Sequence, residues 1–340
     1  MANLTKAHEQ LFNRAPDERF NSLPGLWEHC QREKQDSQTR WYAPVSIKTE
    51  PDNGQLTLLA NEEPFAMTDW SFSQLCKLAE VSKDTVNQLS PQTASHVFQE
   101  TLPRGSKPLQ VFALGRTIRS VHGVSYTRLY NADVLGLALE FVTDFEAPQE
   151  AMNGGTGLYC GEQDMFAFLI DPTGWTEIEG QAFAPGFFLW NSEVGRRSVG
   201  VQTFWFQAVC QNHIVWDAVE VIEFTRKHTT NVHEALENIR TILHNLTKKR
   251  DKRRQGFVRI MKRAMGQSLD PDMEQTLELV CRYGVRRALA QRAIEHAKQE
   301  GALTIFSLVD ALTRMSQDIP YAGDRAAADA TASQLLALAA

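Results

Sequence analysis

The sequence contains no apolar run of the length that a membrane requires. Apolar residues make up 43% of its 340 residues, yet no stretch approaches the roughly 20 consecutive residues needed to span a bilayer. The opening segment MANLTKAHEQ also lacks the basic and then apolar layout of a secretory signal. We therefore expect a soluble, cytoplasmic protein with no membrane partner.

Cysteine is scarce and scattered along the chain. The five cysteines form no CxxC pair and lie far apart in sequence: Cys30, Cys76, Cys160, Cys210 and Cys281. An odd number of separated cysteines favours neither a disulfide framework nor a structural zinc site. His228 and His233 are five positions apart, whereas zinc-binding helices favour a spacing of four. We expect no metal and no other cofactor.

The common active-site motifs are also missing. The sequence has no GxxxxGK loop, no GxGxxG after a strand, no GxSxG turn and no HExxH helix. Gly154-Gly155-Thr156-Gly157 is glycine-rich, but no Lys-Ser or Lys-Thr follows it, so it indicates a loop and not a phosphate cradle. No enzyme class is indicated, and we expect a non-enzymatic function ahead of an enzymatic one.

A basic segment is what the sequence does have. Residues 248–263, KKRDKRRQGFVRIMKR, carry nine Lys or Arg and one Asp, a local charge of +8. The whole chain is at −6, so the remaining residues sum to −14. A positive block in an acidic protein indicates a polyanionic partner such as nucleic acid. The alternatives are a solvated helix face or a segment that pairs with acidic surface elsewhere on the chain.

The hydrophobic pattern predicts an α+β protein. We expect a central, mostly antiparallel β-sheet, with a helical hairpin before it and a helical carboxyl-terminal region. Four parts are expected: an amino-terminal arm with a small β-hairpin (1–64), a mixed core with a curved sheet (65–230), a helical region with the basic run (231–316) and a terminal helix (317–340).

Two helical segments bear on function. The text FSQLCKLAEVSKDTVNQL looks like a helix-turn-helix, but its second helix offers Lys83, Asp84, Asn87 and Gln88, which are nearly neutral, so a plain helical hairpin is favoured. After Asn231 the apolar positions predict a long amphipathic helix with the basic run on its outer face and a break near Gly256.

Several phrases resemble the phage/plasmid-like proteins of domain-of-unknown-function family 932. They are TDWSFSQLCKLAEVS, IRSVHGVSYTRLYNADVL, FFLWNSEVGRRSVGVQTFWFQAVCQNHIVW and LVDALTRMSQDIPYAGDR. The most specific pieces are Asn191–Gly195, which resembles an NSExG turn, and Val209–Asn212, which resembles an xCxN strand end. The resemblance runs from about residue 65 to the carboxyl terminus and implies a protein carried on phages, plasmids or integrated elements. It implies no reaction.

The first functional hypothesis is a non-enzymatic nucleic-acid-binding protein, acting on single-stranded DNA in recombination or replication, where annealing is one such role. The basic run would contact the backbone through Lys248, Lys249, Arg250, Lys252, Arg253 and Arg254, with Arg259, Lys262 and Arg263 further along. Arg196 and Arg197 lie in a predicted hairpin turn, and Trp205 and Tyr126 are candidates for base stacking. Such proteins oligomerise along a strand, so a homo-oligomer is expected.

Two other hypotheses remain open. In one, the chain is a protein-binding module of a mobile element, and its basic helix meets an acidic surface on a host or element-encoded partner. In the other, it is an enzyme of unknown class with a site near Glu193, Cys210 and Asn212, the positions that match the family pattern.

Overall fold

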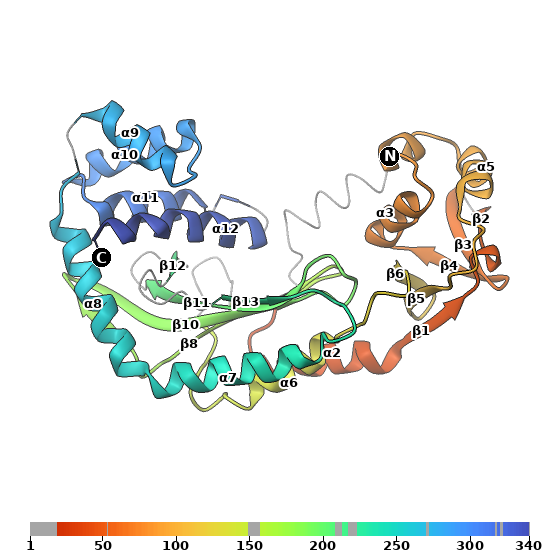
Figure 1. The fold of residues 1–340 in the computed structure, drawn as a ribbon, viewed down its shortest axis with the longest axis horizontal. Coiled ribbons are helices and arrows are strands. Elements are labelled where there is room, and N and C mark those ends of the chain that lie inside the picture. The colour runs from red at the N-terminus through yellow and green to blue at the C-terminus, as the bar shows by residue number, and fades with distance from the viewer. Residues whose placement is uncertain are drawn as a thin grey trace.

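The structure is a computed structural model that describes residues 19–52, 54–148, 157–207, 213–216, 223–269, 272–316, 318–319 and 322–339. These residues form a smaller and a larger lobe, each built around its own β-sheet (Figure 1). Helices and mostly antiparallel sheets occur together, so the predicted α+β class is confirmed, with two sheets in place of one. None of the described helices is both long and apolar enough to cross a bilayer.

The smaller lobe has a six-stranded sheet in the order β1-β5-β6-β4-β3-β2. Its strands are β1 Ser37–Tyr42, β2 Ile47–Asp52, β3 Gln55–Ala60, β4 Glu63–Met67, β5 Leu109–Leu114 and β6 Thr117–His122. The helices α3 Asp69–Leu78, α4 Lys83–Asn87 and α5 Pro91–Thr101 lie between β4 and β5 in the chain, and the short helix η2 spans Pro44–Ser46. Phe72, Leu75 and Phe98 from α3 and α5 are buried against the sheet.

The domain boundary expected between residues 64 and 65 is wrong, because it falls inside β4. This strand pairs with β3 on one side and in parallel with β6 on the other, so residues before and after the expected boundary belong to one sheet. The described residues before this boundary, from Arg19 on, are also divided between the lobes, since α2 (Leu23–Asp36) packs on α6 (Asn131–Leu139) in the larger lobe.

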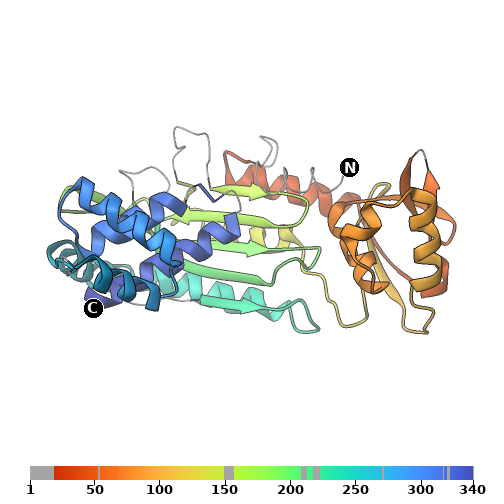
Figure 2. The same ribbon diagram turned by 90° about the horizontal axis from the view of Figure 1, so that it is seen from above.

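The larger lobe has a seven-stranded antiparallel sheet in the order β12-β11-β10-β8-β7, in which β9 also pairs with β10 and β13 with β11. Its strands are β7 Leu158–Cys160, β8 Met165–Ile170, β9 Thr176–Ile178, β10 Gln181–Asn191, β11 Val199–Gln207, β12 His213–Trp216 and β13 Glu223–Arg226. The long β10–β11 hairpin forms its centre. The chain turns back between these strands at the end that faces the smaller lobe (Figure 2).

Two groups of helices pack on the larger sheet. α2, α6 and α7 (Glu234–Lys248) share one core with the apolar side chains of β8, β10 and β11. The second core lies at the far end of the sheet, away from the smaller lobe (Figures 1 and 2). Its helices are α8 Arg250–Gly266, α9 Met273–Arg282, α10 Arg287–Glu300, α11 Ile305–Ser316, α12 Ala322–Ser333 and η3 Gln334–Ala339. Residues 322–339 are therefore not an appended tail, because Leu335 and Leu336 are buried in this core.

The long helix breaks at Lys249, and the break expected near Gly256 is wrong. Lys249 has φ −101° and ψ 14°, outside the helical range, whereas Gly256 lies within α8. The break has a packing reason. Leu243 of α7 is buried in the first core and Phe257 of α8 in the second, so the chain has to change direction between them.

Trp205 of β11 is part of the second core. Its ring is fully buried and stacks on Phe257, with ring centroids 3.9 Å apart and planes 5° from parallel. This pair joins the sheet to α8.

We predict that Trp205→Ala lowers the free energy of unfolding by about 3–5 kcal/mol, because the substitution leaves a large cavity between the sheet and α8. Trp175→Ala is the matched control, since the Trp175 side chain is 40% exposed. Urea unfolding followed by circular dichroism measures both. Equal losses for the two variants would contradict the packing described here.

Candidate nucleic-acid interface

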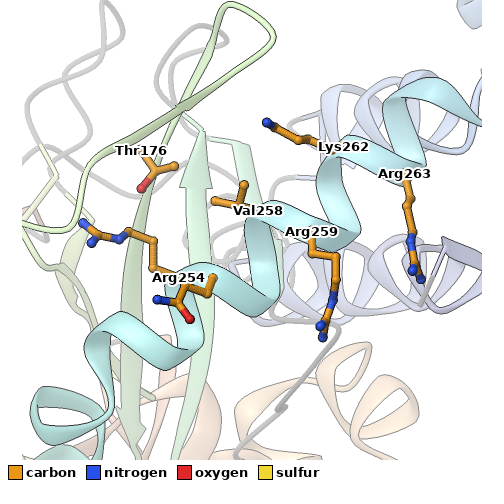
Figure 3. A pocket seen from close by; sticks show the side chains of 7 residues that line it. Thr176, Arg254, Val258, Arg259, Lys262 and Arg263 are labelled. Atoms are coloured by element: carbon orange, nitrogen blue, oxygen red, sulfur yellow. The ribbon is translucent and has the colours of Figure 1, made fainter.

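The outer side of α8 carries an open hollow of about 640 Å³ lined mainly by cations (Figure 3). We call this hollow the basic groove. It is lined by Thr176 of β9 and by Arg254, Gln255, Val258, Arg259, Lys262 and Arg263 of α8. None of the described residues that line it is acidic, so a negatively charged ligand meets no carboxylate in the lining itself.

Helical spacing explains why the cations gather on one side. Phe257, Ile260 and Met261 face the second core. Four exposed cations lie on the solvent side of the helix, separated by seven, three and one positions in sequence: Lys252, Arg259, Lys262 and Arg263. We call these four the outer stripe. Eleven residues of α-helix are about 16 Å long, so the outer stripe is a short linear row of positive charge.

The outer-stripe cations are available to a ligand. No salt bridge is found for any of them among the residues that the structure describes, although neighbouring cations of α8 do form ion pairs. Arg254 at the edge of the groove pairs with Asp251 at 3.1 Å, but both side chains are more than 40% exposed. Such a surface pair contributes at most about 1 kcal/mol, so Arg254 can turn to a phosphate at little cost.

Arg250 and Arg253 are not part of this surface, which corrects the expectation that the whole basic run faces a ligand. They precede Phe257 by seven and four positions and lie on the inner side of α8. Arg250 forms an ion pair with the buried carboxylate of Asp171 and lies 3.5 Å from Asp144. Arg253 is only 8% exposed. The ion pair of Arg250 holds the start of α8 against the lobe, and Arg253 is buried beside it, whereas Lys248 and Lys249 are exposed at the bend.

Arg196 and Arg197 lie at the opposite end of the sheet from the basic groove. They sit in the turn between β10 and β11, and the 11 residues of β10 cover roughly 35 Å. Arg196 lies over the ring of Trp70 at 5.2 Å, and Arg197 pairs with Asp164 at 3.3 Å. The structure therefore does not bring these two arginines together with the basic run.

Neither aromatic residue expected to stack on bases is free to do so. Trp205 is buried against Phe257. The Tyr126 ring already stacks on His122, with centroids 3.6 Å apart, and on His228 at 5.5 Å. Its hydroxyl donates to the carbonyl oxygen of Glu193 at 2.8 Å.

The sequence reasoning missed Trp175, which immediately precedes Thr176 at the groove and is 40% exposed. Its ring touches Phe206 edge-on. The sequence does contain a signal, because Trp175 follows the turn-forming residues Asp171–Gly174 (DPTG), and in the structure Asp171 accepts hydrogen bonds from Thr173 there. An aromatic residue directly after such a turn is less constrained to the core than one inside a strand.

Glu193 belongs to a buried network between the lobes. One carboxylate oxygen accepts the backbone N–H of Asn131, the first residue of α6, at 2.7 Å. The other oxygen lies 3.8 Å from the guanidinium of Arg119. Burial raises the pKa of Glu193, and the Arg119 charge opposes that rise. Glu193 thus holds the start of α6 to the β10–β11 turn; Cys210 and Asn212, the other residues of the enzyme hypothesis, lie outside the described residues.

Comparison with known proteins finds no matching family model, no matching curated protein and no matching solved structure. The resemblance to family 932 therefore stays a prediction from the quoted motifs.

The stacked histidines predict a pH dependence of stability. Burial lowers the pKa of His122 to about 3 and that of His228 to about 4, from an ordinary 6.5. The unfolded chain takes up these protons first, so stability falls as the pH drops below about 6.5 and continues to fall to about pH 4, by at most about 2.7 kcal/mol per pH unit for two protons.

Urea unfolding at a series of pH values measures this slope. We expect His228→Phe to reduce it, because the substitution keeps the stacking ring but removes one titrating group. His96→Phe, on the exposed side of α5, is the matched control and should leave the slope unchanged. An identical slope in the native protein and in His228→Phe would contradict this assignment.

Proposed function

We propose that the chain is a non-enzymatic nucleic-acid-binding protein that holds a phosphate backbone in the basic groove. One observation carries the proposal: Arg254, Arg259, Lys262 and Arg263 line one solvent-open hollow, and none of the described residues in that lining is acidic. The charge run alone is compatible with an internally paired helix. The position of these side chains favours an external polyanion.

Single-stranded DNA is the ligand we favour. The outer stripe, about 16 Å long, can follow a short stretch of one backbone with one phosphate contact for each of its four cations. Trp175 precedes the groove residue Thr176 and offers a partly exposed indole, whose ring contacts Phe206 on the sheet face opposite α8. A strand that leaves the groove past the edge of β9 would meet this ring, and stacking on an aromatic ring is the sequence-tolerant contact that single-strand binding proteins add to phosphate contacts. Context comes from the resemblance to phage- and plasmid-borne proteins, so we place the function in recombination or replication of such elements, in the cytoplasm.

The outer stripe should account for salt-dependent binding. With four phosphate contacts on a single strand, log Kd should change with log salt with a slope of about 3, or about 50-fold between 50 and 200 mM salt. We expect the fourfold variant Lys252→Ala, Arg259→Ala, Lys262→Ala and Arg263→Ala to lose at least about tenfold in affinity at low salt and most of this slope. Fluorescence anisotropy with labelled single-stranded DNA measures both quantities.

The matched control removes the same charge elsewhere. Lys77, Arg104, Lys107 and Arg116 are exposed in the smaller lobe, so their fourfold alanine variant changes the net charge equally. Arg250 and Arg253 are left intact in both variants, since their loss would destabilise α8. Equal weakening by both variants would show an effect of net charge alone, and no binding at moderate salt by the native protein would refute the proposal.

Trp175→Ala tests the preference for single strands. Loss of one stacked base corresponds to about 1–3 kcal/mol, or roughly 5- to 150-fold in affinity. We expect this loss with single-stranded DNA and no change with duplex DNA, whose bases are already stacked. Trp41→Ala is the control, because Trp41 is an exposed tryptophan of the smaller lobe. If Trp175→Ala has the same small effect on the affinity for both DNA forms, Trp175 does not stack on a base of the bound strand.

A protein partner is the second candidate. Val258 lies among the cations in the basic groove (Figure 3). An acidic peptide with one apolar side chain would therefore also fit. If nucleic acid does not bind, a protein partner of this kind is the next hypothesis to test.

A further inference from the structure

A second cluster of chemically reactive side chains lies away from the basic groove, where α2 meets β7. Donor atoms of His29, Glu33 and Cys160 all lie within 4.8 Å of one another. The Cys30 sulfur lies 3.7 Å from the Cys160 sulfur. No local pattern in the sequence indicates this arrangement, because 130 positions separate the two cysteines.

We propose that His29, Glu33 and Cys160 bind one divalent transition-metal ion, zinc by the chemistry of the ligands, and that Cys30, whose sulfur is in contact with that of Cys160, turns toward the ion to complete the set. Two thiolates, an imidazole and a carboxylate are the donors that zinc prefers. Two thiolates on a tetrahedral zinc ion, each about 2.3 Å from the metal, lie about 3.8 Å apart. The observed 3.7 Å matches that spacing and is far longer than the roughly 2.05 Å of a disulfide bond.

Neighbouring residues orient the donor atoms through hydrogen bonds and ion pairs, as residues around metal ligands do. One oxygen of Glu33 pairs with Arg119 at 3.1 Å, while its other oxygen is turned toward the His29 ring at 3.8 Å. The side-chain amide of Asn131 donates to the Cys160 sulfur at 3.8 Å. Partners of this kind fix the direction of ligand lone pairs and are a regular part of metal centres.

The charges also balance. Two thiolates, one carboxylate and a divalent ion leave a net charge of −1, and the buried Arg119 guanidinium beside Glu33 compensates it. Binding releases the two thiol protons to solvent. Cys30 and Cys160 are buried, whereas about a third of the His29 side chain and a fifth of Glu33 are exposed, so an ion can enter from that side.

A metal ion there would tie the amino-terminal helix α2 to the larger sheet. His29, Cys30 and Glu33 all belong to α2, and Cys160 ends β7. Arg119 comes from β6 of the smaller lobe and also faces Glu193, so the site borders the buried network between the lobes. This inference is independent of nucleic-acid binding.

Cobalt titration of the full chain tests the proposal. The protein is reduced, stripped of metal with a chelator and titrated with Co²⁺, which reports thiolate ligands through charge-transfer absorption and tetrahedral geometry through visible d–d bands. We expect one equivalent to bind, Zn²⁺ to displace it, and Zn²⁺ to raise the melting temperature. His29→Gln should weaken Co²⁺ binding by 10-fold or more, and Cys160→Ser should abolish the charge-transfer band.

Controls separate this site from adventitious binding and from misfolding. Cys76→Ser removes a buried cysteine of the smaller lobe and should leave the spectrum unchanged. Because Cys160→Ser alters a buried position, the more exposed His29→Gln provides a second variant that keeps the core intact. The proposal is overturned if the folded, reduced protein shows no thiolate-to-cobalt band, if Cys76→Ser and His29→Gln bind Co²⁺ equally, or if Cys30 and Cys160 form a disulfide even with Zn²⁺ present.

Discussion

The bend at Lys249 decides how the basic segment is presented. If the helix continued straight from Glu234, it would run along the first core. The apolar stripe of α7 would then decide which helix face each cation of the basic run occupies. The bend instead lets α8 pack on a second core, fixed by the Trp205–Phe257 stack and by the ion pair of Arg250 with buried Asp171. That orientation selects the residues of the run that face solvent. The basic groove is thus a product of packing as much as of composition.

The sequence was sufficient for whatever depends on local pattern. The basic run, the amphipathic character of its helix and the α+β class all follow from periodicity and charge. The side of the helix that each cation occupies was not accessible, because it depends on the position of the bend. Arg253 and Lys252 are neighbours in sequence, yet one is buried and the other exposed. The contact of Phe257 with Trp205 and the ion pair of Arg250 with Asp171 set the rotation of α8, and this rotation determines which of the two side chains is buried.

The aromatic residues show a different limit. Alternation along β11 places Trp205 and its neighbours Phe204 and Phe206 on opposite sides of the sheet and predicts that one side is partly exposed, which is wrong, since all three are buried. It cannot say whether either side is open. Here Trp205 enters the second core, while Phe204 and Phe206 join Phe168 in a separate aromatic cluster, so both sides are covered. Clusters made by distant segments, such as Cys30 with Cys160 or Glu193 with Asn131, are likewise invisible to local patterns.

The short reach of the basic groove bears on how the proposed DNA binding would work. About four phosphate contacts give weak attachment at physiological salt, where sequence-independent binding has a Kd of about 10⁻⁴–10⁻⁶ M. Arg196 and Arg197 cannot extend the same site directly, since they lie a full strand length away and already contact Trp70 and Asp164. Tight binding by this surface therefore requires several copies along one strand, whose combined affinity exceeds that of each by orders of magnitude. Homo-oligomerisation would therefore be required only if the proposed function depends on tight binding.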